Sequence, residues 1–200
     1  MRKGDSVSYR LTTLGKKYPP FAWWEGAFTT EQLDHLQEKA ASAIDPGLVG
    51  GRDSSGENNE QVRRSNVSWL TPSDETMWVY KQLEHVIQSL NEQFFQFDLT
   101  DIQDSIQLTN YSSANQGTYK WHQDFNANVS RKLSLVLQLS DPMEYEGGNL
   151  ELLTNGTPTV VPRKRGYIAV FPSWTLHQVT PVTSGTRQSM VVWVGGPNFK

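Results

Sequence analysis

Two histidines and one aspartate occur where they could share a metal ion. His122 and Asp124 stand two residues apart at the end of a predicted strand, and His177 follows 55 residues after His122. Side chains at i and i+2 of a strand project from the same face, so the first two converge and a returning strand can add the third. Two imidazoles and one carboxylate on one side of a metal, with its other positions open, suit Fe(II) and oxygen chemistry. Because this spacing also arises by chance, a second feature has to support it.

The second feature is an arginine on the next predicted strand. Arg187 comes ten residues after His177, across a turn rich in Thr, Ser and Gly, and strand alternation places Ser189 on its face. An arginine that points into a sheet of Val, Met and Trp is an unfavourable unpaired charge unless a carboxylate meets it. The alternative is an edge strand with Arg187 in water. Beside the candidate metal site, we favour a dicarboxylate site in which Arg187 and Ser189 contact the same anion.

Two helices are expected before these strands. Thr29 and Gln32 form a capping-box pattern, which predicts a helix of about a dozen residues that runs towards Ala43. A second helix is predicted from about Ser73 to Phe94, because apolar residues repeat there at spacings of three and four. This stripe consists of Met77, Tyr80, Leu83, Ile87 and Leu90.

From about Asp101 the pattern changes to short apolar segments separated by turn signals. Leucine occupies every second position from 133 to 139, which predicts a strand with one buried face. Asn155-Gly156 predicts a hairpin turn between two short strands. Many short antiparallel strands behind two helices favour a sandwich or jelly roll with the helices packed on one face.

Composition limits the class of protein. The chain has 200 residues, of which 36% are hydrophobic, and no cysteine. This is enough apolar surface for a single domain, and it excludes a disulfide scaffold and thiolate chemistry. A net charge of −3 with scattered Lys and Arg gives no support for a nucleic-acid partner. No apolar run approaches about 18 residues and no signal-peptide pattern is visible, so we expect a cytoplasmic protein without a membrane partner.

The stretch from Tyr111 to Val194 resembles the Fe(II)/2-oxoglutarate-dependent dioxygenases, in particular bacterial and phage-type members of the prolyl 4-hydroxylase-like branch. The motifs follow the order of that family: Tyr111, His122-Gln123-Asp124, Glu146-Gly147-Gly148-Asn149-Leu150, Gly166-Tyr167-Ile168-Ala169-Val170-Phe171-Pro172, His177 and Arg187-Gln188-Ser189. The implied fold is mainly β with N-terminal helices, a double-stranded β-helix of the jelly-roll, cupin-like type. Residues 101–200 would be the catalytic core. Residues 1–100 would add an N-terminal arm (1–20), two packing helices and a lid-like loop (47–59) to the same domain.

The resemblance implies a role for each matching polar residue. His122, Asp124 and His177 would be the catalytic ligands of Fe(II). Arg187 with Ser189 would bind the distal carboxylate of 2-oxoglutarate, which is a co-substrate together with O2.

Three aromatic residues match the family as well. Tyr111 falls where relatives place a tyrosine that hydrogen-bonds the co-substrate. Tyr119 matches a tyrosine near the substrate, although strict strand alternation turns it away from the metal. Trp193 would either wall the pocket near the metal or be a core aromatic. Where some relatives have a tyrosine on the next strand, this chain has Gln138.

The implied reaction is hydroxylation of an unactivated C–H bond with release of succinate and CO2. Demethylation begins with the same hydrogen abstraction and stays open. The substrate would be a prolyl or other residue of a protein or peptide, or else a free amino acid or other small molecule. Arg63, Arg64 and Trp69 are candidate substrate contacts, with a solvated charge pair and a core tryptophan as the alternative. We expect Arg64→Ala to leave 2-oxoglutarate binding intact and to slow turnover of the true substrate.

A function of another class is a non-catalytic jelly-roll binding module, associated with sugars or virions, in which the three candidate ligands are structural. That hypothesis predicts no metal dependence of stability and no succinate. The spacing of Arg187 and Ser189 after His177 argues against it. A cupin-type isomerase or dioxygenase is disfavoured because such sites use three or four histidines and only two fall in this region. The sequence does not fix the oligomeric state.

Overall fold

The computed structural model describes residues 20–50, 56–125 and 130–198. The expected arm at residues 1–20 falls outside these ranges except for its last residue, and the expected lid-like loop at 47–59 falls partly outside them. The elements in chain order are β1 (Ala22–Trp24), α1 (Thr30–Ala41), β2 (Asp45–Pro46), β3 (Arg63–Arg64), β4 (Asn66–Leu70), α2 (Met77–Leu90), the π-helical turn η1 (Asn91–Phe95), β5 (Ile102–Ser112), the 3-10 turn η2 (Ser113–Asn115), β6 (Thr118–His122), β7 (Arg131–Gln138), β8 (Tyr145–Gly147), β9 (Leu150–Thr154), β10 (Thr157–Val160), β11 (Ile168–Pro172), β12 (His177–Val179) and β13 (Val182–Gly195).

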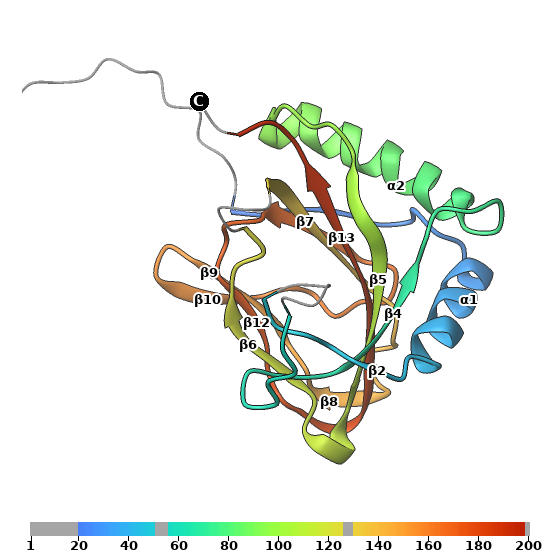
Figure 1. Cartoon of the computed structure of the whole chain (residues 1–200), viewed down its shortest axis with the longest axis vertical. Helices are drawn as coiled ribbons and strands as arrows, with labels where there is room; N and C mark the ends of the chain where they lie inside the picture. Colours follow the sequence, from blue (N-terminus) through green and yellow to red (C-terminus); the bar gives the residue numbers. More distant parts are fainter. Residues whose placement is uncertain (1–19, 51–55, 126–129, 199–200) are drawn as a thin grey trace, which may run out of the picture.

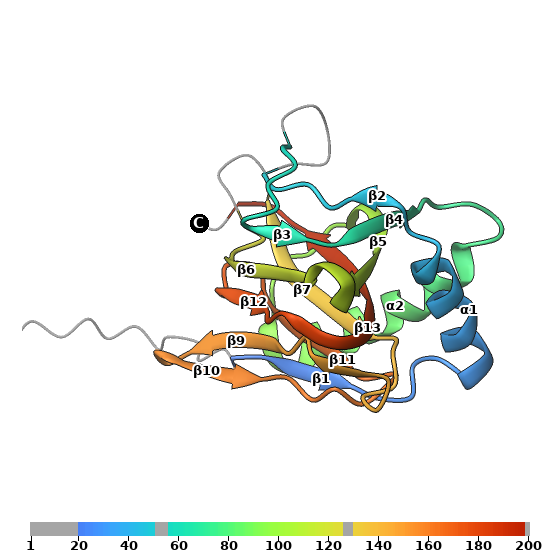
Figure 2. The ribbon, with the colours of Figure 1, turned by 90° about the horizontal axis from the view of Figure 1, so that it is seen from below.

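Two antiparallel sheets form the body of the domain. The larger one has the order β1-β11-β7-β13-β5-β4-β2, with β8 paired to β13, and the smaller one has the order β10-β9-β12-β6-β3. Both helices lie against the outside of the larger sheet, and the smaller sheet lies on its other side (Figures 1 and 2). The prediction of many short strands with helices on one face is therefore confirmed.

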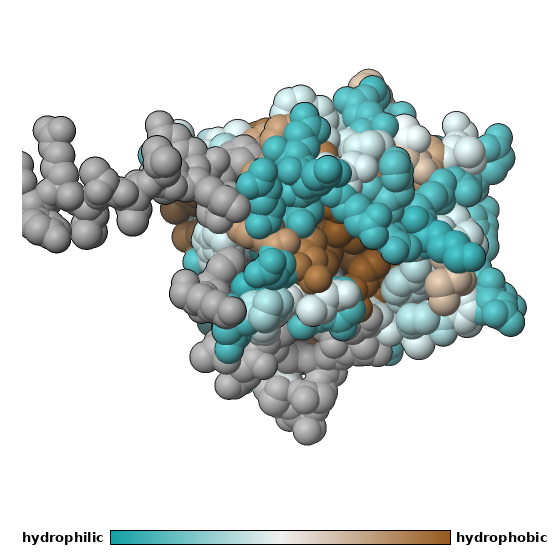
Figure 3. Space-filling view, turned by 90° about the horizontal axis from the view of Figure 1, so that it is seen from above, coloured by the Kyte–Doolittle hydropathy of each residue, from teal (hydrophilic) through white to brown (hydrophobic). Residues whose placement is uncertain are grey.

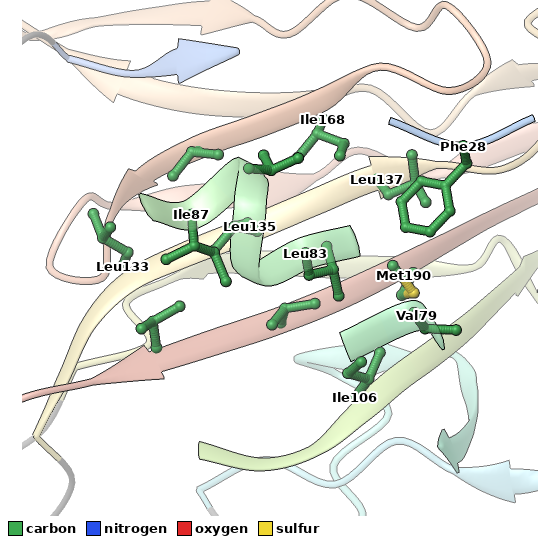
Figure 4. Close-up of a cluster of buried hydrophobic side chains, with 14 of the residues drawn as sticks. Phe28, Val79, Leu83, Ile87, Ile106, Leu133, Leu135, Leu137, Ile168 and Met190 are labelled. Carbon is green, nitrogen blue, oxygen red and sulfur yellow. The ribbon is translucent and has the colours of Figure 1, made fainter. Parts of the chain in front are cut away.

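The helix-side core lies between the larger sheet and α2. Apolar side chains of α2 pack there against leucines of β7 and against neighbouring strands (Figure 4). This packing, more than helix propensity, holds α2 in place. The residues that Figure 4 labels in this core are Phe28, Val79, Leu83, Ile87, Ile106, Leu133, Leu135, Leu137, Ile168 and Met190.

The predicted helices are present, and the second has changed boundaries, since α2 ends at Leu90 and the π-helical turn η1 continues to Phe95. α1 begins after Thr29, whose hydroxyl accepts a hydrogen bond from the backbone N–H of Gln32 as the capping box requires. α2 begins at Met77 and not at about Ser73, because Ser73 and Thr76 hydrogen-bond each other in a preceding turn. Met77 is 39% exposed, so the buried stripe starts at Val79 instead.

β7 is buried on both faces, whereas its alternating leucines predicted one buried face. The leucines at 133, 135 and 137 lie in the helix-side core. The intervening Ser134, Val136 and Gln138 are also buried, because the smaller sheet covers the other face of the strand. The space between the sheets is the barrel interior, and its apolar lining is Tyr111, Val136, Tyr145, Leu150, Leu152, Val161, Tyr167, Ala169, Phe171, Val179 and Val182.

The Asn155-Gly156 hairpin is confirmed. It joins β9 to β10, and both turn residues have positive φ, at +53° and +79°. Positive φ at both central positions is the geometry of the two-residue turn that Asn-Gly favours.

The molecular surface adds two observations. Figure 3 shows a hydrophobic hollow bordered by hydrophilic residues on the face seen from above. Among the helices that the described ranges contain, none is long and apolar enough to cross a membrane.

Candidate metal centre and anion pocket

Three side chains converge at one end of the smaller sheet. His122 is the last residue of β6 and lies directly opposite His177, the first residue of β12. Asp124 lies beyond the strand, where its backbone N–H donates to the carbonyl of Ser173 at 3.0 Å. The Asp124 carboxylate is 3.8 Å from Nε2 of His122 and 3.5 Å from Nε2 of His177. One ligand atom from each of the three residues lies within 4.8 Å of the others.

Backbone carbonyls orient both imidazoles. Nδ1 of His122 is 2.7 Å from the carbonyl of Lys120, and Nδ1 of His177 is 2.9 Å from that of Thr175. A carbonyl oxygen only accepts, so in each ring Nδ1 carries the proton and Nε2 keeps its lone pair. Both lone pairs therefore belong to the atoms that approach Asp124, which is the tautomer that a metal ligand needs.

The electrostatics of the cluster fit a divalent cation. The pKa of His122 is lowered to about 3, first by burial and then by the adjacent His177, and the Asp124 charge only partly opposes them. Burial raises the pKa of Asp124, but the two imidazoles and the Ser134 hydroxyl outweigh burial and hold it below its ordinary value. A neutral His122 beside an ionised Asp124 is the protonation state that metal binding requires. The donor set of two nitrogens and one carboxylate suits Fe(II) with open positions.

The lowered pKa of His122 predicts an acid-dependent loss of stability in the metal-free protein. The unfolded chain binds this proton near pH 6.5, but the folded chain does so only near pH 3. Well above pH 6.5 the imidazole is neutral in both states and has no effect on stability, whereas between pH 6.5 and 3 only the unfolded chain binds the proton, so stability falls as the pH falls. Between pH 7 and pH 5, in the presence of a chelator, the wild-type chain should lose up to about 2 kcal/mol more stability than His122→Gln. Urea unfolding at both pH values measures this, and equal losses in the two proteins would contradict it.

Tyr119 faces the candidate metal site because β6 contains a bulge. Opposite β12, His122 pairs with His177 and Tyr119 pairs with Val179, so three steps along β6 match two along β12. The extra residue brings Tyr119 and His122 to the same face. Their rings stack with centroids 3.5 Å apart, and burial raises the pKa of Tyr119 to about 12. The expectation from strict alternation, that Tyr119 turns away from the metal, is wrong.

A second polar group lies in the barrel interior around Arg187. Arg187 is 1% exposed; its Nη2 donates to Oε1 of Gln138 at 3.0 Å and its Nη1 donates to the hydroxyl of Ser189 at 3.3 Å. Tyr111 lies opposite Arg187 on β5, and its ring centroid is 5.4 Å from the Arg187 Cζ. Over the described part of the chain, no carboxylate forms an ion pair with Arg187.

Several hydrogen-bond donors around Arg187 have no acceptor partner. Arg187 Nε, Gln138 Nε2 and the Tyr145 hydroxyl are buried and have no partner. Gln138 must turn its oxygen towards Arg187, which has no acceptor, and this leaves its two N–H groups unpaired. A Cβ atom on Gly148 would lie 3.0 Å from Cδ of Arg187 and 3.3 Å from Cε2 of Tyr145, so glycine allows both side chains to approach. Buried donors around an unpaired guanidinium fit a carboxylate, which accepts only. The pocket therefore has the chemistry to bind a carboxylate.

The remaining predicted residues have mixed surroundings. Arg64 donates to the carbonyls of Asn115, Glu60 and Gln116 at 2.7, 3.1 and 2.9 Å, so its guanidinium is occupied by backbone. Its contact with substrate stays a prediction. Trp193 is 8% exposed and stacks under Arg131, whose Cζ is 4.1 Å from the ring, which suits both alternatives considered for it.

Sequence reasoning missed two groups that the fold brings to this site, Tyr145 and Ser134, and it named a third, Arg63, only together with its neighbour Arg64. Arg63 is 6% exposed and lies 4.7 Å from the Tyr119 ring, opposite Tyr119 in the β3–β6 pair. Tyr145 stands just before the Glu146-Gly147-Gly148 motif, and that position was its only signal. Ser134 lies between leucines of β7, and its hydroxyl donates to Oδ2 of Asp124 at 2.7 Å.

Comparison with known proteins agrees with the geometry of this site. Residues 106–195 match the sequence model of the 2OG-Fe(II) oxygenase superfamily. Among curated relatives, a PKHD-type hydroxylase of Synechococcus sp. (strain CC9605) is 44% identical over 90 residues, or 44% of this chain and 40% of the relative. The PKHD-type hydroxylase YbiX of Shigella flexneri is 29% identical over 181 residues, or 84% of this chain and 75% of the relative. The chain thus matches only about two fifths of the length of the more identical relatives.

Solved structures share the fold. A prolyl-4-hydroxylase of Pseudomonas putida has a TM-score of 0.70 at 20% identity, covering 88% of this chain and 92% of that one. A prolyl hydroxylase of Trichoplax adhaerens, in complex with a hypoxia inducible factor oxygen degradation domain peptide fragment, has a TM-score of 0.73 at 12% identity, covering 88% and 84%. The predicted double-stranded β-helix and the resemblance to prolyl 4-hydroxylase-like oxygenases are confirmed. The family also implies the cofactors that the sequence predicted, Fe(II) and 2-oxoglutarate with O2.

Proposed function

We propose that this chain is an Fe(II)- and 2-oxoglutarate-dependent oxygenase that hydroxylates an unactivated C–H bond. The observation that carries the proposal is the His122, Asp124 and His177 cluster, whose ligand atoms lie within 4.8 Å of one another with both Nε2 lone pairs available. The balanced reaction is R–H + O2 + 2-oxoglutarate to R–OH + succinate + CO2. The division into a preamble at residues 1–100 and a catalytic core at 101–200 is part of this proposal.

The residues of the chain divide the work between holding a metal and holding a co-substrate. His122, Asp124 and His177 would hold Fe(II), which, when bound, supplies the redox chemistry between O2, 2-oxoglutarate and the substrate C–H bond. Arg187 would bind the distal carboxylate through its forked donors, with Ser189, Gln138 and the hydroxyl of Tyr145 around it. The apolar interior lining excludes water, which strengthens these charge-assisted hydrogen bonds.

The substrate in this proposal is a residue of a peptide or protein, prolyl in the first instance. The structurally similar protein with a bound peptide fragment supports an extended ligand, and Trp121 and Phe125, which are 36% and 37% exposed, flank the candidate ligands in the sequence. Tyr119, stacked on His122, is the side chain best placed to contact the target residue. A free amino acid or other small molecule, and demethylation instead of stable hydroxylation, are distinguished by the product.

The proposal is tested by an anaerobic titration of the metal-free protein with Fe(II) and then with 2-oxoglutarate. The expected result is a weak visible metal-to-ligand charge-transfer band that requires both additions and is absent in His122→Ala. Succinate should then form when O2 is admitted, and a panel of proline-containing peptides should increase its rate. Failure to bind Fe(II), with no succinate formed, would overturn the proposal and favour the non-catalytic binding module.

A further inference from the structure

Two buried serine hydroxyls connect to the carboxylate of Asp124. Oγ of Ser134 donates to Oδ2 of Asp124 at 2.7 Å, and Oγ of Ser173 lies 3.0 Å from Oγ of Ser134. Both serines are 0% exposed. The backbone carbonyl of Ser173 also accepts from the N–H groups of Asp124 and Phe125, at 3.0 and 3.1 Å. Ser173 therefore holds the backbone of Asp124 while Ser134 holds its side chain.

The order of donors in this chain of hydroxyls is fixed. An ionised carboxylate only accepts, so the single proton of Ser134 goes to Asp124. Ser134 must then accept from Ser173, which gives the direction Ser173 to Ser134 to Asp124. Aligned hydroxyls polarise one another, so the Ser173 donor strengthens the bond from Ser134 to the carboxylate.

The position of Asp124 explains why it needs such support. Its two histidine neighbours are fixed as a pair across β6 and β12, but Asp124 lies two residues past the end of β6. No strand pairing therefore sets the direction of its carboxylate. Ser134 comes from the middle of β7, opposite Phe171 and Trp193 in the adjacent strands, and Ser173 directly follows β11. The larger sheet thus places a rigid donor against a ligand that the smaller sheet leaves free to rotate.

We propose that Ser134 and Ser173 are positioning residues that fix the Asp124 carboxylate for metal binding. Oδ2 is held by Ser134 and kept 3.5 Å from Nε2 of His177, while Oδ1 faces His122. The inference rests on the proposed function only in taking Asp124 as a ligand. It assigns to β7 a role in the metal site that no residue of the family motifs indicates.

Metal affinity tests this directly, without turnover. Co(II), which reports its coordination in the visible spectrum, is titrated anaerobically into the metal-free wild type, Ser134→Ala, Ser134→Thr and Ser173→Ala. Loss of an outer-shell partner typically weakens metal binding by about 10–100-fold. Ser134→Ala should show that loss and an altered Co(II) spectrum. Ser134→Thr, which keeps the hydroxyl, should restore binding, and Ser173→Ala should have a smaller effect because it removes only the polarising donor.

Ser140→Ala is the matched control. Ser140 is also buried, and its hydroxyl bonds to Thr186 and Gln188 rather than to a candidate ligand, so its loss should leave Co(II) affinity unchanged. Thermal melting of each metal-free variant shows whether it is folded. Wild-type affinity and spectrum in Ser134→Ala would overturn this inference alone. A wild-type chain that binds no Co(II) would overturn both this inference and the proposed metal centre.

Discussion

Asp124→Ala is expected to cause the largest loss of metal binding of any single substitution in the chain. Asp124 is the only anionic member of the candidate triad, so its removal takes away the charge that offsets the desolvation of a divalent cation. The Fe(II) affinity should fall by more than the roughly 10–100-fold expected for an outer-shell partner, and succinate formation should fall to background. Anaerobic calorimetry with Fe(II) and a succinate assay measure the two losses.

Asp124→Asn gives the control for shape. The amide keeps an oxygen that accepts from Ser134, but it carries no charge, so metal affinity should stay far below wild type although the side-chain geometry is preserved. Retention of wild-type Fe(II) affinity in either variant would show that the metal binds at another place in the protein. The triad would then be structural, as the binding-module hypothesis requires.

Arg187→Leu is expected to remove co-substrate binding while leaving metal binding intact. Truncating one partner of a buried, hydrogen-bonded charge pair costs about 2–5 kcal/mol, which is roughly 30- to 5,000-fold in Kd. Calorimetry of 2-oxoglutarate binding to the Mn(II)-loaded protein measures the change, and the Mn(II) affinity itself is the internal control. An unchanged 2-oxoglutarate Kd would show that the buried guanidinium has only a structural role.

Gln138→Glu separates the charge of the pocket from its shape. Gln138 accepts from Arg187 at 3.0 Å, so a glutamate there would place a carboxylate beside the guanidinium and occupy it from within the protein. The Kd for 2-oxoglutarate should rise at neutral pH as it does in Arg187→Leu. Gln138→Met, which is similar in size and uncharged, should raise this Kd less, because it removes the amide donors of Gln138 but places no competing carboxylate beside Arg187.

The chemistry of the site was predictable from the sequence because it depends on residue type and order. His122, Asp124, His177 and Arg187 were recognised from their spacing and from the resemblance, and the fold brings the first three together while it buries the fourth. The capping box at Thr29 and the Asn155-Gly156 hairpin were predictable for the same reason, since each is encoded within four residues.

What the sequence did not predict depends on tertiary contacts. Tyr119 reaches the site through a bulge, and a prediction from strict strand alternation does not allow for the extra residue that a bulge inserts. Arg63 and Arg64 are adjacent and chemically alike, and only the pairing of β3 with β6 decides which of them lies over Tyr119. Ser134 was hidden because the leucines around it define a strand pattern in which it is the polar, outward position. The second sheet reverses that assignment by covering the face on which Ser134 lies.

The burial of β7 on both faces has a consequence for how this protein can change during evolution. Its odd-numbered leucines at 133, 135 and 137 are constrained by side-chain volume, since they fill the space beneath α2. Its even-numbered neighbours Ser134 and Gln138 are constrained by their hydrogen bonds, since they contact Asp124 and Arg187. The two sets of residues lie on the same strand but on opposite faces, one towards the helix-side core and the other towards the barrel interior. Within the same eight residues, substitutions that alter helix packing can therefore accumulate at the odd positions independently of substitutions at the even positions that alter the ligand pocket.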